Sequence, residues 1–249
     1  MSQQENLQPL AHQVLEELWY TREHLPFKPS ADIDMVWVFS APGTVNDEPN
    51  AGPYKDRLFN LDLINEGVRI VQEVTALRLH KSVNEITKLE IESDGPVLFY
   101  NGERASKGHN YPQNEHFEAL VADPNFPLPV SKVLIDDIEE VNTPGQIKQL
   151  AERLENKSEQ FSNIAVVSAV QHSLRVGRYL EKYKDLFSDK VYFYNAASAQ
   201  THNESAIAGL EARKVLGYYR AGHLAAHSMF YPDPVKSTRP DLRRVATNK

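Results

Sequence analysis

Several residue types and patterns are missing from this sequence, and each absence excludes a class of protein. The 249 residues contain no cysteine, which rules out disulfide bonds, thiolate metal sites and a cysteine nucleophile. No stretch approaches the ~18 apolar residues of a membrane span. The first residues, MSQQENLQPLAHQVLEEL, lack the basic and apolar regions of a signal peptide. We therefore expect a cytoplasmic protein that makes no membrane contact.

The common nucleotide-binding and hydrolase motifs are also missing. No G-x-G-x-x-G follows an apolar run, no G-x-S-x-G occurs, and GERASKG at 102–108 is only superficially similar to a P-loop. The formal net charge is −7 and the pI is about 5.7. The chain therefore lacks the excess of positive charge that displaces counterions from nucleic acid. Nucleic acid is not an expected partner, whereas a small molecule is.

The composition, with 41% hydrophobic and 24% charged residues, is typical of an ordinary folded domain. Five short, mostly apolar runs predict buried β-strands at 33–40, 95–103, 132–136, 163–168 and 190–195. Apolar spacing and start signals predict helices at 6–23, 57–79, 141–157, 168–183 and 203–220. The alternation indicates an α/β fold, with a doubly wound, mostly parallel, five-stranded Rossmann-like sheet and flanking helices.

The length of the chain fits one large domain. We expect an N-terminal helix within residues 1–30 that packs on the domain, a Rossmann-like domain at 31–200, and a C-terminal helix and tail at 201–249. The region 54–93 is longer than one crossover helix needs. We therefore expect a helical insertion there, which forms a small helical lobe with the N-terminal helix.

Ligands of doubly wound sheets bind beyond the carboxyl ends of the strands, near the point where the strand order reverses. This rule selects five polar segments as candidate parts of a site. They are Ser40 to Gly43, Asn101 to Glu103, Asp136 to Thr143, Ser168 to Arg175, and the residues after Asn195.

The stretch SAVQHSLRVGRYLEKY at 168–183 is the most suggestive of these segments. His172 and Arg175 stand three apart at a predicted helix start, so they share a face, and the free N–H groups of a helix start favour an anion. Arg175 could clamp a phosphate or carboxylate, and His172 could act as an acid or a base. Spacing alone nevertheless favours an ordinary helix start, whose polar side chains face solvent or pair with carboxylates.

Two other clusters carry less information. HLAAH at 223–227 has a metal-capable spacing, but it lacks the glutamate of a zinc protease and a third ligand, so we expect no metal site. The acidic run DDIEE at 136–140 is typical of a solvated face. One of its carboxylates could instead receive a ribose hydroxyl or a cationic ligand group.

Two segments in order, DDIEEVNTPGQ at 136–146 and VVSAVQHSLRVGRYLE at 166–181, carry a family resemblance. They resemble the YdcF/SanA/ElyC-like family of bacterial proteins, a domain family of unknown function. Its pattern has an acidic residue, N-T before a helix with an asparagine, and then V-T-S-x-x-H-x-x-R-A. The matching positions here are Asp137, Asn142, Thr143, Gln146, Val167, Ser168, Ala169, His172 and Arg175.

Two earlier matches to this family are looser, and the resemblance as a whole covers about residues 33–195. NGE at 101–103 stands where the family often has S-G-G, and Arg57 matches the arginine of a family helix. The chain also departs from the pattern. Glu103, Glu140 and Gln146 replace a glycine, a frequent serine and an asparagine, respectively.

Many members of that family carry an N-terminal membrane span, whereas this chain looks like the soluble YdcF-type subgroup. For this subgroup the resemblance implies a Rossmann-like fold and the binding of S-adenosylmethionine. We expect His172 to be the catalytic residue, through hydrogen bonding or proton transfer, and Arg175 to hold the anion with the amides near Ser168. The other expected ligand-binding residues are Ala169, Ser40, Ala41, Gly43, Arg57, Asn101, Gly102, Glu103, Asp137, Asn142 and Thr143.

These observations support three hypotheses. In the first, the protein binds a nucleotide-like or anionic small molecule at the strand carboxyl ends and is an enzyme, either a transferase or a hydrolase. In the second, the same pocket binds a ligand without turnover, as a sensor or interaction module. In the third, the residues have only structural roles: His172 bridges to the Asn142–Thr143 segment, and Arg175 pairs with Asp137.

Overall fold

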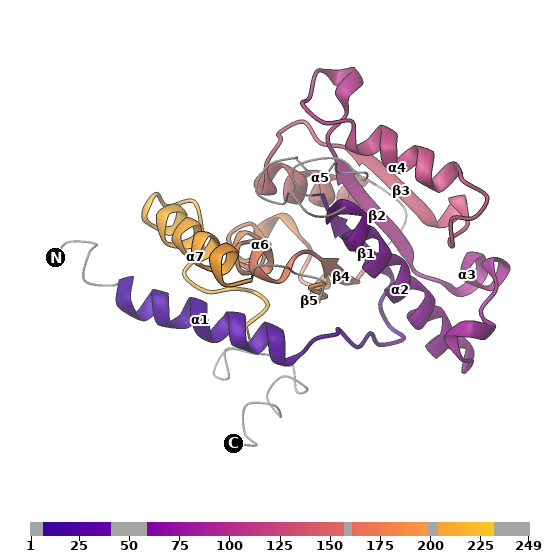
Figure 1. Cartoon of the computed structure of the whole chain (residues 1–249), viewed down its shortest axis with the longest axis horizontal. Helices are drawn as coiled ribbons and strands as arrows, with labels where there is room; N and C mark the ends of the chain where they lie inside the picture. The colour runs from indigo at the N-terminus through magenta and orange to yellow at the C-terminus, as the bar shows by residue number, and fades with distance from the viewer. Residues whose placement is uncertain (1–6, 41–58, 157–160, 199–203, 232–249) are drawn as a thin grey trace.

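A five-stranded parallel β-sheet forms the centre of the molecule (Figure 1). It is seen in a computed structural model that describes residues 7–40, 59–156, 161–198 and 204–231. The strands are β1 (Met35–Phe39), β2 (Val97–Gly102), β3 (Val133–Asp137), β4 (Asn163–Val167) and β5 (Tyr192–Asn195). Their order is β3-β2-β1-β4-β5, and every neighbouring pair is parallel. The predicted α/β fold with a five-stranded Rossmann-like sheet is therefore confirmed.

Helices cover both faces of this sheet. They are α1 (Leu7–Glu23), α2 (Phe59–Leu79), α3 (Lys88–Asp94), α4 (Gln113–Ala122), α5 (Thr143–Asn156), α6 (Val170–Lys182) and α7 (Glu204–Arg220). One apolar core joins the sheet to α2, α3 and α4, and a second joins it to α1, α5, α6 and α7.

The central strand, β1, shows why its sequence is apolar throughout. Its five residues are all buried. Val36 and Val38 belong to the core on the α2 side, whereas Met35, Trp37 and Phe39 belong to the core on the α6 side. Alternate side chains of a strand point to opposite faces of the sheet. A strand that is covered on both faces therefore needs an unbroken apolar run.

The expected helical lobe is not formed, because its two parts lie on opposite faces of the sheet. The long helix α2 packs directly on β1 and β2 as a crossover helix, and α3 packs on α2. The N-terminal helix α1 packs instead on α6 and α7. The extra length of the 54–93 region is thus explained by a long crossover helix followed by a short one.

The apolar spacing of the sequence does not predict two of the helices, α3 and α4. The seven-residue helix α3 starts with a capping box, in which the Glu90 amide donates to Thr87 Oγ1 (3.3 Å) and the Thr87 amide donates to Glu90 Oε2 (2.9 Å). The helix α4 connects β2 to β3 and buries Phe117 and Val121. Both helices are short, so neither gives a long repeating apolar pattern.

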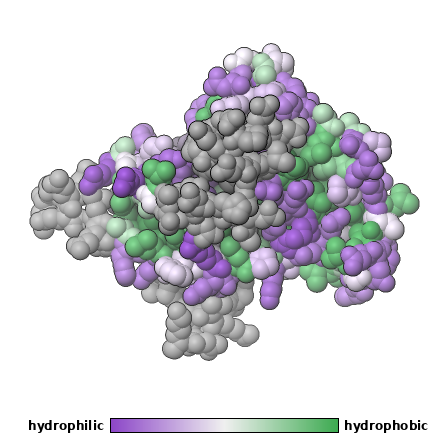
Figure 2. Space-filling model, viewed as in Figure 1, coloured by the Kyte–Doolittle hydropathy of each residue, from purple (hydrophilic) through white to green (hydrophobic). Residues whose placement is uncertain are grey.

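The many charged residues of the sequence, 24% of the total, agree with a largely hydrophilic described surface (Figure 2). Figure 2 shows hydrophilic side chains over much of the described part of one face, with hydrophobic ones interspersed among them. Among the described helices, none is long and apolar enough to cross a membrane.

A buried ion pair joins α1 to α6. The side chains of Glu17 and Arg178 are almost fully buried, and Arg178 Nη1 donates to Glu17 Oε2 and to the Leu174 carbonyl oxygen (2.9 Å). Burial raises the pKa of Glu17, and the neighbouring Arg178 charge opposes this increase. The pair therefore fixes α1 against the sheet face that carries α6.

We predict that Arg178→Met lowers the free energy of unfolding by about 3–5 kcal/mol, because it leaves the Glu17 carboxylate buried without a counter-charge. The double variant Glu17→Leu/Arg178→Met should recover most of this loss, since both charges are then absent. Urea unfolding followed by circular dichroism measures both values. Equal stability of the single and double variants would contradict the prediction.

Candidate functional site

Several predicted site residues line one cavity of about 260 Å³ at the carboxyl ends of the strands. The strand order reverses at β1, which has β2 on one side and β4 on the other. This is where ligands bind in doubly wound sheets. The cavity is lined by Ser40, Glu103, Gln113, Ile138, Val141, Asn142, Thr143, Pro144, Gln146, His172, Arg175, Tyr179 and Tyr218.

A second cavity, of about 530 Å³, lies at the opposite end of the sheet. Its walls include Phe161 and Ser162 just before β4, Lys190 and Val191 just before β5, and the end of α5. It contains none of the predicted site residues. We therefore place the candidate site in the smaller cavity, where the strand-end residues meet.

Two buried amide side chains, those of Asn101 and Gln146, connect the segments beside the cavity. Trp37 Nε1 donates to Asn101 Oδ1 (2.9 Å), and Asn101 Nδ2 donates to the Gln146 carbonyl oxygen (2.8 Å). The Gln146 amide in turn donates to the Asn101 carbonyl oxygen (3.1 Å) and to Ser40 Oγ. These bonds tie the ends of β1 and β2 to the first turn of α5. Asn101 thus holds the strand ends together and does not itself line the cavity.

His172, in the first turn of α6, stands at the centre of the candidate chemistry. Its Nε2 atom lies 3.3 Å from Thr143 Oγ1, and its ring meets the Phe39 ring edge to face at 5.7 Å. Burial lowers the pKa of His172 well below its usual value, and the positive charges of Arg175 and Lys214 add to this effect. The imidazole is therefore neutral near pH 7 and can accept a hydrogen bond at one of its ring nitrogens. The expected bridge from His172 to the Asn142–Thr143 segment is present.

Arg175, one turn further along α6, is paired with α7 and not with Asp137 as the third hypothesis expects. Arg175 Nε donates to Glu211 Oε2 (2.6 Å), and Lys214 Nζ lies 2.6 Å from Glu211 Oε1. The Arg175 guanidinium also lies 5.9 Å from the centre of the Tyr218 ring. Two cations thus share one buried carboxylate, so the three described side chains Arg175, Lys214 and Glu211 together carry one positive charge in excess.

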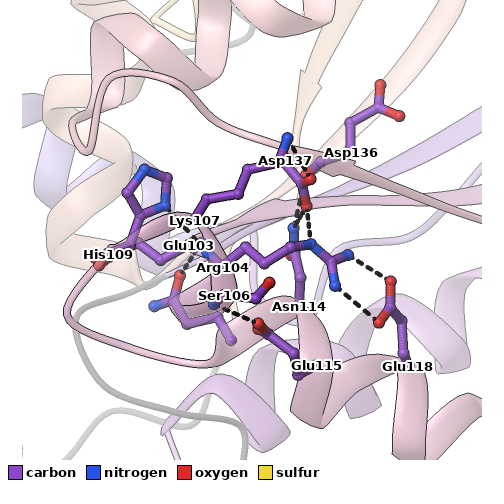
Figure 3. A network of polar contacts seen from close by, with 11 residues as sticks. Glu103, Arg104, Ser106, Lys107, His109, Asn114, Glu115, Glu118, Asp136 and Asp137 are labelled. Atoms are coloured by element: carbon purple, nitrogen blue, oxygen red, sulfur yellow. Dashed lines mark hydrogen bonds and ion pairs between the residues drawn. The ribbon is translucent and has the colours of Figure 1, made fainter.

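Asp137 belongs to a separate network and does not line the cavity. Figure 3 shows its carboxylate within reach of Arg104, Lys107 and Asn114, while Arg104 also reaches Glu118. Burial raises the pKa of Asp137, but the hydrogen bonds from Lys107, Arg104 and Asn114 outweigh burial and lower it to about 2. The acidic residue expected to contact a ligand therefore anchors the loop after β2.

The remaining residues of the resemblance pattern have visible local roles. Asn142 caps α5, because Asn142 Oδ1 accepts from the Gly145 amide (2.7 Å). This leaves the Thr143 hydroxyl beside His172. Ser168 and Ala169 are buried at the end of β4 and do not line the cavity.

Gly102 also lies outside the cavity walls, and its lack of a side chain has a steric reason. A Cβ atom there would lie 2.8 Å from both Asn114 Oδ1 and Tyr100 Cε1. Ala41, Gly43 and Arg57 lie outside the described residues.

The structure thus brings six of the predicted residues to the cavity: Ser40, Glu103, Asn142, Thr143, His172 and Arg175. Sequence analysis misses the contribution of α7, which supplies Tyr218 to the wall and Glu211 to Arg175. It also misses Gln113 and Tyr179. The apolar residue Leu210 of α7 is 51% exposed, whereas its neighbour Glu211 is 1% exposed. A carboxylate buried by pairing gives no apolar signal.

Comparisons with protein-family models, with curated proteins and with solved structures find no match to this chain. Within the part of the chain that the structure describes, no group of three or more histidine, cysteine, aspartate or glutamate residues could hold a metal ion. His227 of the HLAAH segment contacts α1, where its Nδ1 atom lies 3.0 Å from Gln13 Nε2. The interpretation of the site therefore depends on its own geometry.

We predict that His172 makes folding pH-dependent. A lowered pKa means that the unfolded state binds more protons as the pH falls below about 6.5, so the native state loses stability there and retains it above. The stability of the wild type relative to His172→Phe should decrease by up to about 1.4 kcal/mol per pH unit below that value. Urea unfolding at a series of pH values measures the difference.

The control for this experiment is Thr143→Val, which removes the contact with His172 but keeps the imidazole. It should show the same pH dependence as the wild type. A constant difference between wild type and His172→Phe from pH 7 to about pH 5 would show that the pKa of His172 is not lowered.

Proposed function

We propose that this protein binds a small molecule carrying an anionic group in the cavity at the carboxyl ends of the strands, and that it acts on that molecule as an enzyme. The observation that carries the proposal is the convergence of a neutral imidazole and a guanidinium on one cavity at the strand carboxyl ends. The family resemblance supports a nucleotide-like ligand. It makes S-adenosylmethionine the first compound to test.

Arg175 is the anion-binding group in this proposal. Its Nε and Nη2 atoms face Glu211, whereas Nη1 has no hydrogen-bond partner among the described residues. The excess positive charge of Arg175 and Lys214 over Glu211 favours an anion at this wall. The start of α6 adds to the effect, because Ala169 provides no side-chain cap, and the positive end of a helix dipole attracts negative charge.

His172 is the proton-transfer group. Its lowered pKa keeps the imidazole neutral at pH 7, and an anion bound beside Arg175 would favour the protonated form that a general base adopts when it takes a proton from a hydroxyl or from water. The Thr143 hydroxyl at 3.3 Å holds the ring in place or relays the proton. This chemistry fits a transferase or a hydrolase. A non-catalytic sensor would use the same contacts without turnover.

The size of the cavity limits the ligand. A volume of about 260 Å³ is below the range of about 300–1,000 Å³ that is typical for drug-sized ligands. The described walls therefore fit a small polar metabolite or one end of a larger one. S-adenosylmethionine would extend beyond them.

We predict that the wild type binds at least one of S-adenosylmethionine, adenosine 5′-monophosphate and ribose 5-phosphate, as measured by isothermal titration calorimetry. Arg175→Lys should weaken binding about tenfold or more, because a lysine cannot reproduce the planar guanidinium contact with both Glu211 and an anion. Mass spectrometry after long incubation separates turnover from simple binding.

Arg153→Lys is the matched control for this prediction. Like Arg175, Arg153 pairs with a carboxylate, that of Asp136 (3.0 Å), but Arg153 does not line the cavity. It should retain wild-type affinity. Absence of binding by all three compounds, or equal losses in the Arg175 and Arg153 variants, would remove the support for this function. Binding without any product would identify the sensor.

A further inference from the structure

We infer that Glu103 recognises a hydrogen-bond donor of the ligand, either a hydroxyl or an ammonium group, and so makes the site selective for molecules that carry both a donor and an anion. This inference rests on the proposed function and adds the chemistry of the ligand's second end. It concerns a position at which the chain departs from the family pattern, where a glycine is usual.

Glu103 is a buried residue, and only one of its two carboxylate oxygens has a hydrogen-bond partner among the described residues. The residue is 5% exposed and lines the cavity. Its Oε2 atom accepts from the amides of Asn110 (3.1 Å) and Tyr111 (3.3 Å). Its Oε1 atom has no hydrogen-bond partner among the described residues, and it is not sealed from the cavity as a fully buried atom would be. Because this atom can be reached from the cavity, a ligand donor can bind it directly, and a hydrogen bond to a charged acceptor is stronger than one between neutral groups.

The basic residues next to Glu103 do not neutralise it. Figure 3 shows that Arg104 extends toward Glu118 and Asp137, and that Lys107 also reaches Asp137. Within the described residues, Glu103 takes part in no ion pair. The carboxylate thus contributes a negative charge to the cavity wall, which favours a cationic or strongly polarised donor.

The sheet places Glu103 and Arg175 on opposite sides of β1. Glu103 follows β2, and Arg175 lies in the helix that follows β4. The ends of these two strands are separated by two inter-strand spacings, about 10 Å. One wall therefore carries an acceptor and the other a guanidinium. A carboxylate plays the same role toward a ribose hydroxyl in dinucleotide-binding sheets. Phosphorylated sugars and phosphorylated amines both have the required pair of groups.

Two pairs of probes separate these sources of the donor. Ribose 5-phosphate and 2-deoxyribose 5-phosphate differ by one hydroxyl, and phosphoethanolamine and ethyl phosphate differ by the ammonium group. In calorimetric titrations, the wild type should prefer the donor-bearing member of at least one pair by about tenfold. The pair that shows the preference identifies the donor. Glu103→Gln should reduce that preference to about twofold or less, without weakening the binding of the donor-free member.

Glu115→Gln is the matched control. Glu115 Oε1 accepts from the Ser106 amide (3.0 Å), so it supports the same loop, but it does not line the cavity. This variant should keep the wild-type preference. If Glu115→Gln and Glu103→Gln lose it equally, Glu103 acts only through the loop and the inference is wrong. It is also wrong if the wild type binds both members of each pair with equal affinity.

The outcomes also distinguish this inference from the proposed function. Phosphate probes that bind through Arg175 without any donor preference would preserve the proposed function and overturn the role of Glu103. S-adenosylmethionine carries both an ammonium group and ribose hydroxyls. If it is the only compound that binds, a roughly tenfold lower affinity in Glu103→Gln, with wild-type affinity in Glu115→Gln, supports the inference. Equal affinities of the wild type and Glu103→Gln overturn it. Absence of binding by every compound overturns both proposals.

Discussion

Coverage of both faces of the sheet is the constraint on which the rest of this structure depends. Every residue of β1 is buried, and two apolar cores fill the space between the sheet and its helices. Polar side chains of the sheet that could contact a ligand therefore lie at the strand ends. The segments that leave the carboxyl ends must also satisfy their own backbone groups there. The Asn101 and Gln146 amides do this for β1, β2 and α5, and the cavity lies above them.

Charge is distributed around this cavity in separate groups. Asp137 and its basic partners form one group behind the loop after β2. Arg175, Glu211 and Lys214 form another group between α6 and α7. His172 stays neutral between them, because burial and the nearby cations both disfavour its charged form. Such a combination of a neutral base, an excess cation and a half-satisfied carboxylate resembles a ligand site more than a set of stabilising pairs.

The sequence predicts the elements of this fold well and the partners of its site residues poorly. All five strands begin and end within two residues of their expected ends. The inner strands β1, β2 and β4 leave a continuous apolar signal because they are covered on both faces, whereas the edge strands β3 and β5 are at most partly buried and are found from their short apolar runs. The short helices α3 and α4 leave no such signal, although the capping residues Thr87 and Glu90 mark the start of α3. The strand-end rule likewise brings His172, Arg175 and Thr143 to one cavity, since it follows from topology alone.

Partners could not be predicted in the same way, because ion pairs depend on the three-dimensional approach of distant segments. Arg175 has acidic candidates in several predicted loops, and only the packing of α7 on α6 selects Glu211. Asp137 matches the family position and follows a strand, yet Arg104 and Lys107 hold it outside the cavity. A residue type at a matching position thus identifies a candidate, whereas the neighbouring side chains decide its role.

The two arginines of α6 define how much of the chain the fold requires. Arg175 depends on Glu211 near the C-terminal end of the described chain, and Arg178 depends on Glu17 near its N-terminal end. A minimal fragment built only around the strands, from residue 31 to 200, would leave both guanidinium groups at the helix surface without their carboxylates. The first and last helices are therefore part of the same packed unit as the sheet. They supply the carboxylates that pair with the two arginines of α6.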